Sequence, residues 1–195
     1  MSLLADLTTS LKQYVDGWSI SKPYEYRPLP SPRFIRVLWL YPAEKSSAAI
    51  SCDLQDVSLD EETHYDALSY AWDGQELSSP IECAGRLLLT TPNCASALRQ
   101  LRDDTRDRVV WVDSLCINQA SIADRNQQVA LMGEIYKKAN MVIAWLGESD
   151  SASTKAYERL KELADKMQEQ DPPKRNDRNF DWGQVEALQK RKRRP

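Results

Sequence analysis

Histidine and cysteine, the residues that most often bind zinc, are scarce in this sequence. The one histidine is His64, and the cysteines stand at positions 52, 83, 94 and 116 without a C-x-x-C pair. This spacing fits neither a zinc centre nor a disulfide framework, whereas a magnesium site made of carboxylates alone stays open. We therefore expect reduced thiols inside a cell, no metal site of the usual kinds and no certain cofactor.

Long hydrophobic runs are also absent. No apolar segment reaches the roughly 20 residues that span a bilayer, and Asp6 and Lys12 interrupt the N-terminal apolar pattern where a signal peptide needs a continuous core. The net charge is only -3, with 42% hydrophobic and 28% charged residues, which disfavours both a disordered chain and one that coats nucleic acid. The composition predicts a soluble globular protein of the cytoplasm without a membrane span.

The two ends of the chain are expected to lie outside its main domain. Apolar residues recur at helical spacing over residues 3–18 and a proline-rich segment follows, so residues 1–23 are predicted to form a helix and a linker. Residues 170–195 are predicted to form a polar linker, a short helix from Asp181 and a basic tail. The terminal KRKRRP is typical of a solvated tail, and a nuclear-import signal is the alternative.

The first half of the main domain is rich in strand signals. Segments 34–41 and 49–59 contain β-branched and aromatic residues and are predicted to pair antiparallel. A strand at 65–72 follows, and the sequence IECAGRLLLT has an Ala-Gly turn between two apolar runs, which indicates a small hairpin. Thr91 and Pro92 then have the character of an N-cap and a first helical residue.

The second half alternates between strands and helices. The predicted order is a strand at 109–113, a helix at 121–139, a strand at 141–147 and a helix at 153–168. Such alternation favours an α/β fold in which helices flank a mostly parallel sheet. The N-terminal antiparallel strands and the hairpin are then additions to this sheet.

Polar residues gather where three of the predicted parallel strands end. In open α/β sheets ligands bind beyond the carboxyl ends of the strands, because loop amides and helix N-termini converge there. The candidates, strand by strand, are Ser69, Tyr70, Trp72 and Asp73; Asp113, Ser114, Cys116, Asn118 and Gln119; and residues 147–150. Each can bind a ligand, or it can hydrogen-bond loop backbone groups that would otherwise be buried without partners.

The helix predicted at 121–139 opens with an acid and a base. Ser121 and Asp124 fit a capping box, and the helix dipole stabilises an acid in the first turn by about 0.3 to 1 kcal/mol. Arg125 gains nothing from the dipole and needs an anionic partner, for which we predict Asp113. Cys116 could act as a nucleophile, but no histidine lies near it in sequence, and a small, partly buried thiol is the better interpretation.

Two stretches, YDALSYAW and VVWVDSLCINQASIADRNQQVALMGEIYKKANMVIAWLGE, closely resemble the HET domain of fungal heterokaryon-incompatibility proteins. EYRPLPSPRFIRVLWL and IECAGRLLLTTPNCASALRQLR fit the flanking parts, so the resemblance covers about residues 24 to 150. We therefore predict a HET domain at 24–169. Family members usually continue into a further block with aromatic residues, and this chain stops short of it.

The resemblance implies a role in non-self recognition and programmed cell death, a form of fungal innate immunity, by a module that self-associates or responds to a protein trigger. HET domains are also thought to be similar to TIR domains, whose flavodoxin-like α/β fold in many members cleaves NAD. The matching acid is then Asp124. The family usually has Glu-Arg where this chain has Asp124 and Arg125, and Trp-Gly where it has Trp72, Asp73 and Gly74. Aspartate is one methylene shorter, and catalysis is sensitive to shifts of about 1 Å.

We expect a cell-death signalling module that acts by self-association or partner contact; the alternative is a TIR-like glycohydrolase with NAD as substrate. The candidate catalytic residues are Asp113 and Asp124, and the candidate ligand-binding residues are Ser69, Tyr70, Trp72, Asn118, Gln119 and Arg125. In the enzyme, Asp124 would stabilise the ribosyl cation, Tyr70 or Trp72 would stack on a ring, and Arg125 would hold a phosphate. A nucleic-acid partner is not expected, since the basic run lies at one terminus of an acidic chain.

Overall fold

The structure, a computed structural model, describes residues 22–72, 74–148, 155, 158 and 159. The chain divides after Leu146 into two compact units, and every strand and helix named below lies in the first. Residues 155, 158 and 159 are helical, within the helix predicted at 153–168. The rest of that helix, the helix predicted at 3–18 and the tail from residue 170 lie outside the described residues. Among those described, no helix is long and apolar enough to cross a bilayer.

The elements follow one another in the order expected from the sequence. The strands are β1 (Phe34–Leu40), β2 (Ser51–Ser58), β3 (Asp66–Tyr70), β4 (Ser79–Cys83), β5 (Arg86–Thr90), β6 (Arg108–Val112) and β7 (Met141–Trp145). The helices are α2 (Pro92–Leu101), α3 (Asp113–Cys116) and α4 (Ile122–Lys138). The short helix α3 stands where the sequence indicated a loop.

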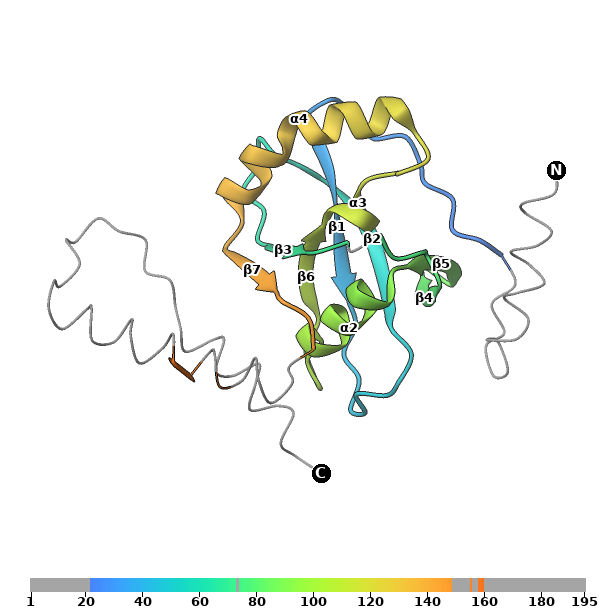
Figure 1. Ribbon diagram of the computed structural model, residues 1–195. Helices are drawn as coiled ribbons and strands as arrows, with labels where there is room; N and C mark the ends of the chain where they lie inside the picture. The colour runs from blue at the N-terminus through green and yellow to red at the C-terminus, as the bar shows by residue number, and fades with distance from the viewer. Residues whose placement is uncertain (1–21, 73, 149–154, 156–157, 160–195) are drawn as a thin grey trace, which may run out of the picture. The chain divides into compact units, whose positions relative to one another are not determined.

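These strands join one sheet in the order β5-β4-β2-β1-β6-β3-β7 (Figure 1). The predicted α/β class and the antiparallel β1–β2 pair are confirmed. The prediction of a mostly parallel sheet holds only for part of it. The pairs β3–β6, β3–β7 and β2–β4 are parallel, whereas β1–β2, β1–β6 and β4–β5 are antiparallel. Sequence patterns show which segments become strands, but neighbours in the sheet are chosen by packing.

Strand β1 lies inside the sheet, between β2 and β6, and is not a marginal addition. Its residues Ile35, Val37, Leu38 and Leu40 have no exposed surface. A strand buried on both faces has a nearly continuous apolar sequence, and FIRVLWL has that character with one exception, Arg36. The buried charge of Arg36 therefore requires a partner inside the protein.

Two local signals in the sequence are confirmed. The hydroxyl of Thr91 accepts a hydrogen bond from the amide of Cys94 at 3.2 Å and caps α2, with proline as the first helical residue. In the turn between β4 and β5, Ala84 and Gly85 have φ angles of 53° and 70°. Positive φ at both central residues is what a two-residue type I′ hairpin turn requires.

Candidate functional site

The carboxyl ends of β3 and β6 bring together three of the predicted site residues. Tyr70 ends β3 and Trp72 follows it, while Asp113 comes directly after β6. The indole Nε1 of Trp72 donates to the two carboxylate oxygens of Asp113 at 3.3 and 3.2 Å. The rings of Tyr70 and Trp72 are stacked, with centroids 6.5 Å apart and planes 16° apart. We call these three residues the strand-end cluster.

Asp113 is the titratable group of the strand-end cluster. Burial raises the pKa of its carboxyl group, while hydrogen bonds from Trp72 and from the amide of Ser114, the latter at 2.7 Å, act in the opposite direction. Burial also raises the pKa of Tyr70. The cluster therefore combines a partly desolvated carboxylate with the ring of Trp72, which is 40% exposed.

Asn93, which sequence reasoning missed, fixes the loop that holds Trp72. Its side-chain amide donates to the carbonyl of Ala71 at 2.7 Å, and its carbonyl accepts from the indole of Trp145 at 2.8 Å. The backbone amide of Asn93 donates to the side-chain carbonyl of Gln75 at 2.9 Å. Asn93 thus ties α2 to the ends of β3 and β7. These contacts join residues 18 to 52 positions apart, so no local signal could have found them.

Ser69 does not belong to the strand-end cluster. Successive residues of a strand point to opposite faces, so Ser69 and Tyr70 diverge. The hydroxyl of Ser69 lies near Tyr136 of α4, where its hydrogen bond offsets part of the rise that burial causes in the pKa of that tyrosine. Ligand binding by Ser69 stays a prediction.

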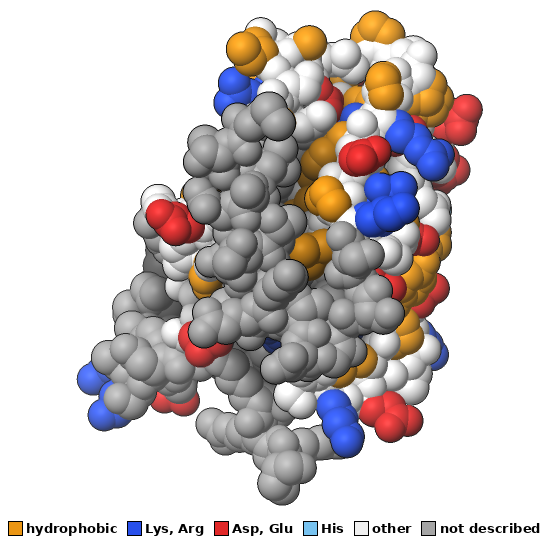
Figure 2. Space-filling view, turned by 90° about the vertical axis from the view of Figure 1, so that its right-hand side faces the viewer, with side chains coloured by type: hydrophobic (Ala, Val, Ile, Leu, Met, Phe, Trp, Pro, Cys, Tyr) orange, Lys and Arg blue, Asp and Glu red, His pale blue; other side chains and the backbone are white. Residues whose placement is uncertain are grey.

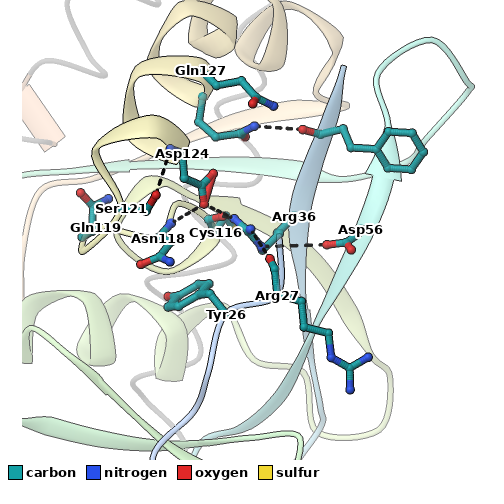
Figure 3. A network of polar contacts seen from close by, with 12 residues as sticks. Tyr26, Arg27, Arg36, Asp56, Cys116, Asn118, Gln119, Ser121, Asp124 and Gln127 are labelled. Carbon is teal, nitrogen blue, oxygen red and sulfur yellow. Dashed lines mark hydrogen bonds and ion pairs between the residues drawn. The ribbon is translucent and has the colours of Figure 1, made fainter. Parts of the chain in front are cut away.

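Asp124, the predicted acid on α4, is paired with Arg36 on β1. The guanidinium of Arg36 donates to Oδ2 of Asp124 at 2.7 Å, and the two side chains are 3% and 12% exposed. Arg36 also donates to the backbone carbonyls of Cys116 at 3.2 Å and Arg27 at 2.8 Å. Figure 3 shows this arrangement, which we call the Arg36–Asp124 cluster. It joins the first turn of α4 to a central strand of the sheet.

The chain before β1 covers this cluster. The ring of Tyr26 lies 5.3 Å from the guanidinium of Arg36, and its hydroxyl donates to the carbonyl of Leu115 at 2.8 Å. A ring face near a cation is attractive, so Tyr26 stabilises the charge that it covers. Asp56 on β2 adds a second, more distant carboxylate at 4.0 Å. Asp124 is therefore enclosed by protein groups.

Asn118 and Gln119 make contacts that anchor a loop. The amide of Asn118 donates to Asp124 at 3.2 Å, and its side-chain carbonyl accepts from the amide of Ala120 at 3.1 Å. Gln119 donates to the carbonyl of Asp113 at 2.9 Å. Ser121 caps α4 by accepting from the amide of Asp124 at 3.2 Å, which is one half of the predicted capping box. The other half is missing, because the amide of Ser121 donates to the carbonyl of Asn118. These bonds match the anchoring interpretation, and ligand binding by the two amides stays a prediction.

Arg125 departs from its prediction. Both it and Asp113 are described, and no ion pair joins them; Asp113 is bonded to Trp72 and Ser114 instead. Arg125 lies on the exposed side of α4. Consecutive helical residues point about 100° apart, so once Asp124 turns inward to Arg36, its neighbour turns outward. The two predicted catalytic acids consequently belong to separate clusters: the carboxylate of Asp113 accepts from Trp72 and Ser114, and that of Asp124 accepts from Arg36 and Asn118.

Cys116 gives its backbone carbonyl to the Arg36–Asp124 cluster, but its thiol bonds to the backbone of β6. Cys116 is fully buried, burial raises the pKa of its thiol to about 12, and its sulfur accepts from the amide of Val112 at 3.4 Å, so it is an inert core residue.

A cavity of about 280 Å³ lies between the β2–β3 loop and the end of α4, lined in part by Thr63, His64 and Lys138. It contains no residue of either cluster. No group of three potential metal-binding side chains occurs among the residues that the structure describes.

Comparison with known proteins decides the family. The model of the heterokaryon incompatibility protein (HET) family matches residues 65–194, which is well over half of the chain. This chain belongs to the HET family. It is 30% identical over 142 residues to "Heterokaryon incompatibility protein 6, OR allele" of Neurospora crassa. That alignment covers 66% of this chain and 21% of the relative, so the chain spans about a fifth of the relative's length. No solved structure matches.

The match to the HET family contains most of the two clusters, but not all of the second. Asp113 and Asp124 lie within residues 65–194, together with Trp72. Arg36 lies before residue 65, and so does Tyr26, which covers it. The HET segment of this chain therefore depends on an earlier strand for the cation that neutralises Asp124.

Proposed function

We propose that this chain is a signalling module of fungal heterokaryon incompatibility, acting in non-self recognition and cell death by self-association or contact with a partner protein. Membership of the HET family and the similarity to the heterokaryon incompatibility protein of Neurospora crassa support the incompatibility role. The relative is about five times as long as the matched segment, so the trigger could reside in regions beyond such a module.

The observation that carries a non-enzymatic mechanism is the burial of Asp124 against Arg36. A carboxylate at 2.7 Å from a guanidinium, and 12% exposed, has its charge already neutralised by the protein. An acid that stabilises a substrate cation must instead present its charge to the substrate. The carboxylate of Asp124 thus serves the fold by joining the first turn of α4 to β1 and by accepting from the amide of Asn118.

Forced self-association of the full chain tests this proposal. The chain is fused to a domain that dimerises on addition of a small molecule and is expressed in a filamentous fungus, and viable cells are counted with a dye that dead cells admit. We expect viability to fall further after the small molecule is added, and equally for the parent and for Asp113→Asn. Unchanged viability in the presence of the small molecule would contradict the module's proposed mode of action.

The second candidate function is NAD glycohydrolysis, and the observation that favours it is the strand-end cluster. Trp72 offers an exposed ring on which a planar group could stack, beside the desolvated carboxylate of Asp113. In this reaction the bond between nicotinamide and ribose breaks, nicotinamide leaves, and water adds to the ribosyl carbon. Asp113 is then the acid nearest the aromatic pair, whereas Asp124 and Arg125 are placed elsewhere.

Chromatographic measurement of nicotinamide release from NAD, at high protein concentration, tests the second candidate. If the strand-end cluster is catalytic, Asp113→Asn should abolish release, and Arg125→Gln, an exposed change on α4 outside this cluster, should leave it intact. Release that is the same for the parent and Asp113→Asn would exclude this cluster. Folding of each variant is checked by circular dichroism.

A further inference from the structure

The two edges of the sheet are protected differently, and β5 forms the protected one. Residues that precede β1 in the sequence lie beside β5. The amide of Tyr24 donates to the carbonyl of Leu87 at 2.7 Å, and the amide of Leu87 donates to the carbonyl of Lys22 at 2.9 Å. Pro23 forms an isolated parallel bridge to the same leucine. β5 also carries a charged residue, Arg86, which is 41% exposed and lies 3.9 Å from Glu25. Figure 2 views this side of the molecule and shows acidic and basic side chains among the hydrophobic ones that are not covered by grey atoms. Added chain, proline and charge are the usual means of blocking an edge.

The opposite edge, β7, lacks these devices in the part of the chain that the structure describes. It pairs there with β3 alone, and the segment Met141–Trp145 contains no charged residue and no proline. Val142 is 46% exposed, and Ala144 on the same side is also exposed. An uncharged apolar edge strand presents unpaired backbone groups that can pair with another strand.

We propose that β7 pairs antiparallel with β7 of a second copy of this chain, across a two-fold axis at Ile143. This inference rests on the proposed function, in which the module self-associates, and it names the surface. The axis sets Val142 of one copy opposite Ala144 of the other, and Met141 opposite Trp145. Alternation places both Val142 and both Ala144 side chains on the exposed face, where a larger side chain meets a smaller one.

The chemistry of the edge favours a copy of itself over a charged partner strand. A neutral strand gives a charged peptide no ion pair, whereas a second β7 is equally neutral and apolar. A two-fold axis makes each contact between the two copies occur twice. Dimers with such an axis are the commonest form of protein self-association. The product is one sheet continuous through both copies.

Sedimentation velocity of the full chain over a range of concentrations tests the pairing. Val142→Lys places a charge on the proposed surface, and Val129→Lys places the same charge on the exposed face of α4, where the valine is 57% exposed. We expect the parent and Val129→Lys to dimerise alike, and Val142→Lys to raise the dissociation constant at least about tenfold. A parent that stays monomeric up to about 100 µM, or two variants with equal effects, would overturn the proposal.

Cross-linking tests the register independently of affinity. Opposite residues in an antiparallel pair have Cβ atoms about 4.5 to 5.5 Å apart, so a mixture of Val142→Cys and Ala144→Cys chains should form mixed disulfide dimers on mild oxidation. The four native cysteines are buried and should not compete. Each variant alone should cross-link less, and a mixture that cross-links no better overturns the register.

These results can be separated from failure of the proposed function. A chain that dimerises through β7 but does not kill cells when dimerised refutes the signalling role and leaves the surface standing. A chain that kills on forced dimerisation but forms no β7 dimer refutes the surface alone. If Val142→Lys lowers the urea midpoint of a monomer without changing its mass, β7 is covered within one chain, and the proposal is wrong.

Discussion

Replacing Arg36 with methionine should destabilise the folded chain by about 3 to 5 kcal/mol, because Asp124 then keeps a buried carboxylate without its cation. Arg36 and Asp124 are 3% and 12% exposed, so solvent screens their charges little. The change also removes the donors to the carbonyls of Arg27 and Cys116. Each lost hydrogen bond typically costs about 1 kcal/mol. These costs are included in the range of about 3 to 5 kcal/mol and are not added to it, because the contacts of a single residue are not independent.

Urea unfolding followed by circular dichroism measures this loss. A matched control is Arg33→Met, since Arg33 also pairs with two acids, Asp60 and Glu134, but its side chain is 42% exposed. Exposed pairs contribute about 0 to 1 kcal/mol each, so this control should lose far less stability. The double variant Arg36→Met with Asp124→Leu should recover part of the loss, because an apolar pair leaves no buried charge.

Two results would refute this reasoning. If Arg36→Met costs no more than Arg33→Met, the buried pair does not hold α4 to β1. If the double variant is no more stable than the sum of its single variants predicts, Arg36 and Asp124 are not coupled. Either result would free Asp124 for a role in chemistry and weaken the argument for a non-enzymatic module.

Three further changes follow from contacts described above. Asn93→Ala should lower the unfolding free energy by about 1 to 3 kcal/mol, measured in urea, because it removes the bonds to Ala71 and Trp145. Thr91→Ala should cost about 1 kcal/mol and Thr91→Ser much less, since serine keeps the capping hydroxyl; equal losses would contradict the cap. Stability should fall as pH rises from about 9 to 12, because the unfolded chain loses the Cys116 proton first, at its ordinary thiol pKa, while the folded thiol retains it up to a pKa of about 12. Cys116→Ala should make this fall shallower in urea midpoints measured at several pH values.

The strand-end cluster was predictable because it depends on a general property of parallel strands. The carboxyl ends of β3 and β6 meet at one edge, so residues just after them converge whatever their partners are. Trp72 and Asp113 were therefore expected together, and they are hydrogen-bonded. The outward position of Arg125 could not be predicted in this way. Its position depends on which side of α4 faces the sheet, and the packing of the whole helix determines that side.

The sequence alone determined the local elements of this protein and its family. Turn residues, caps and hydrophobic periodicity act over a few positions, so the Ala84-Gly85 turn and the Thr91 cap could be located without a fold. Only the tertiary structure decided that β1 lies inside the sheet and that Arg36 meets Asp124, 88 positions away. A buried charge needs a partner somewhere in the protein, and the identity of that partner is fixed by the strands and helices that pack around it.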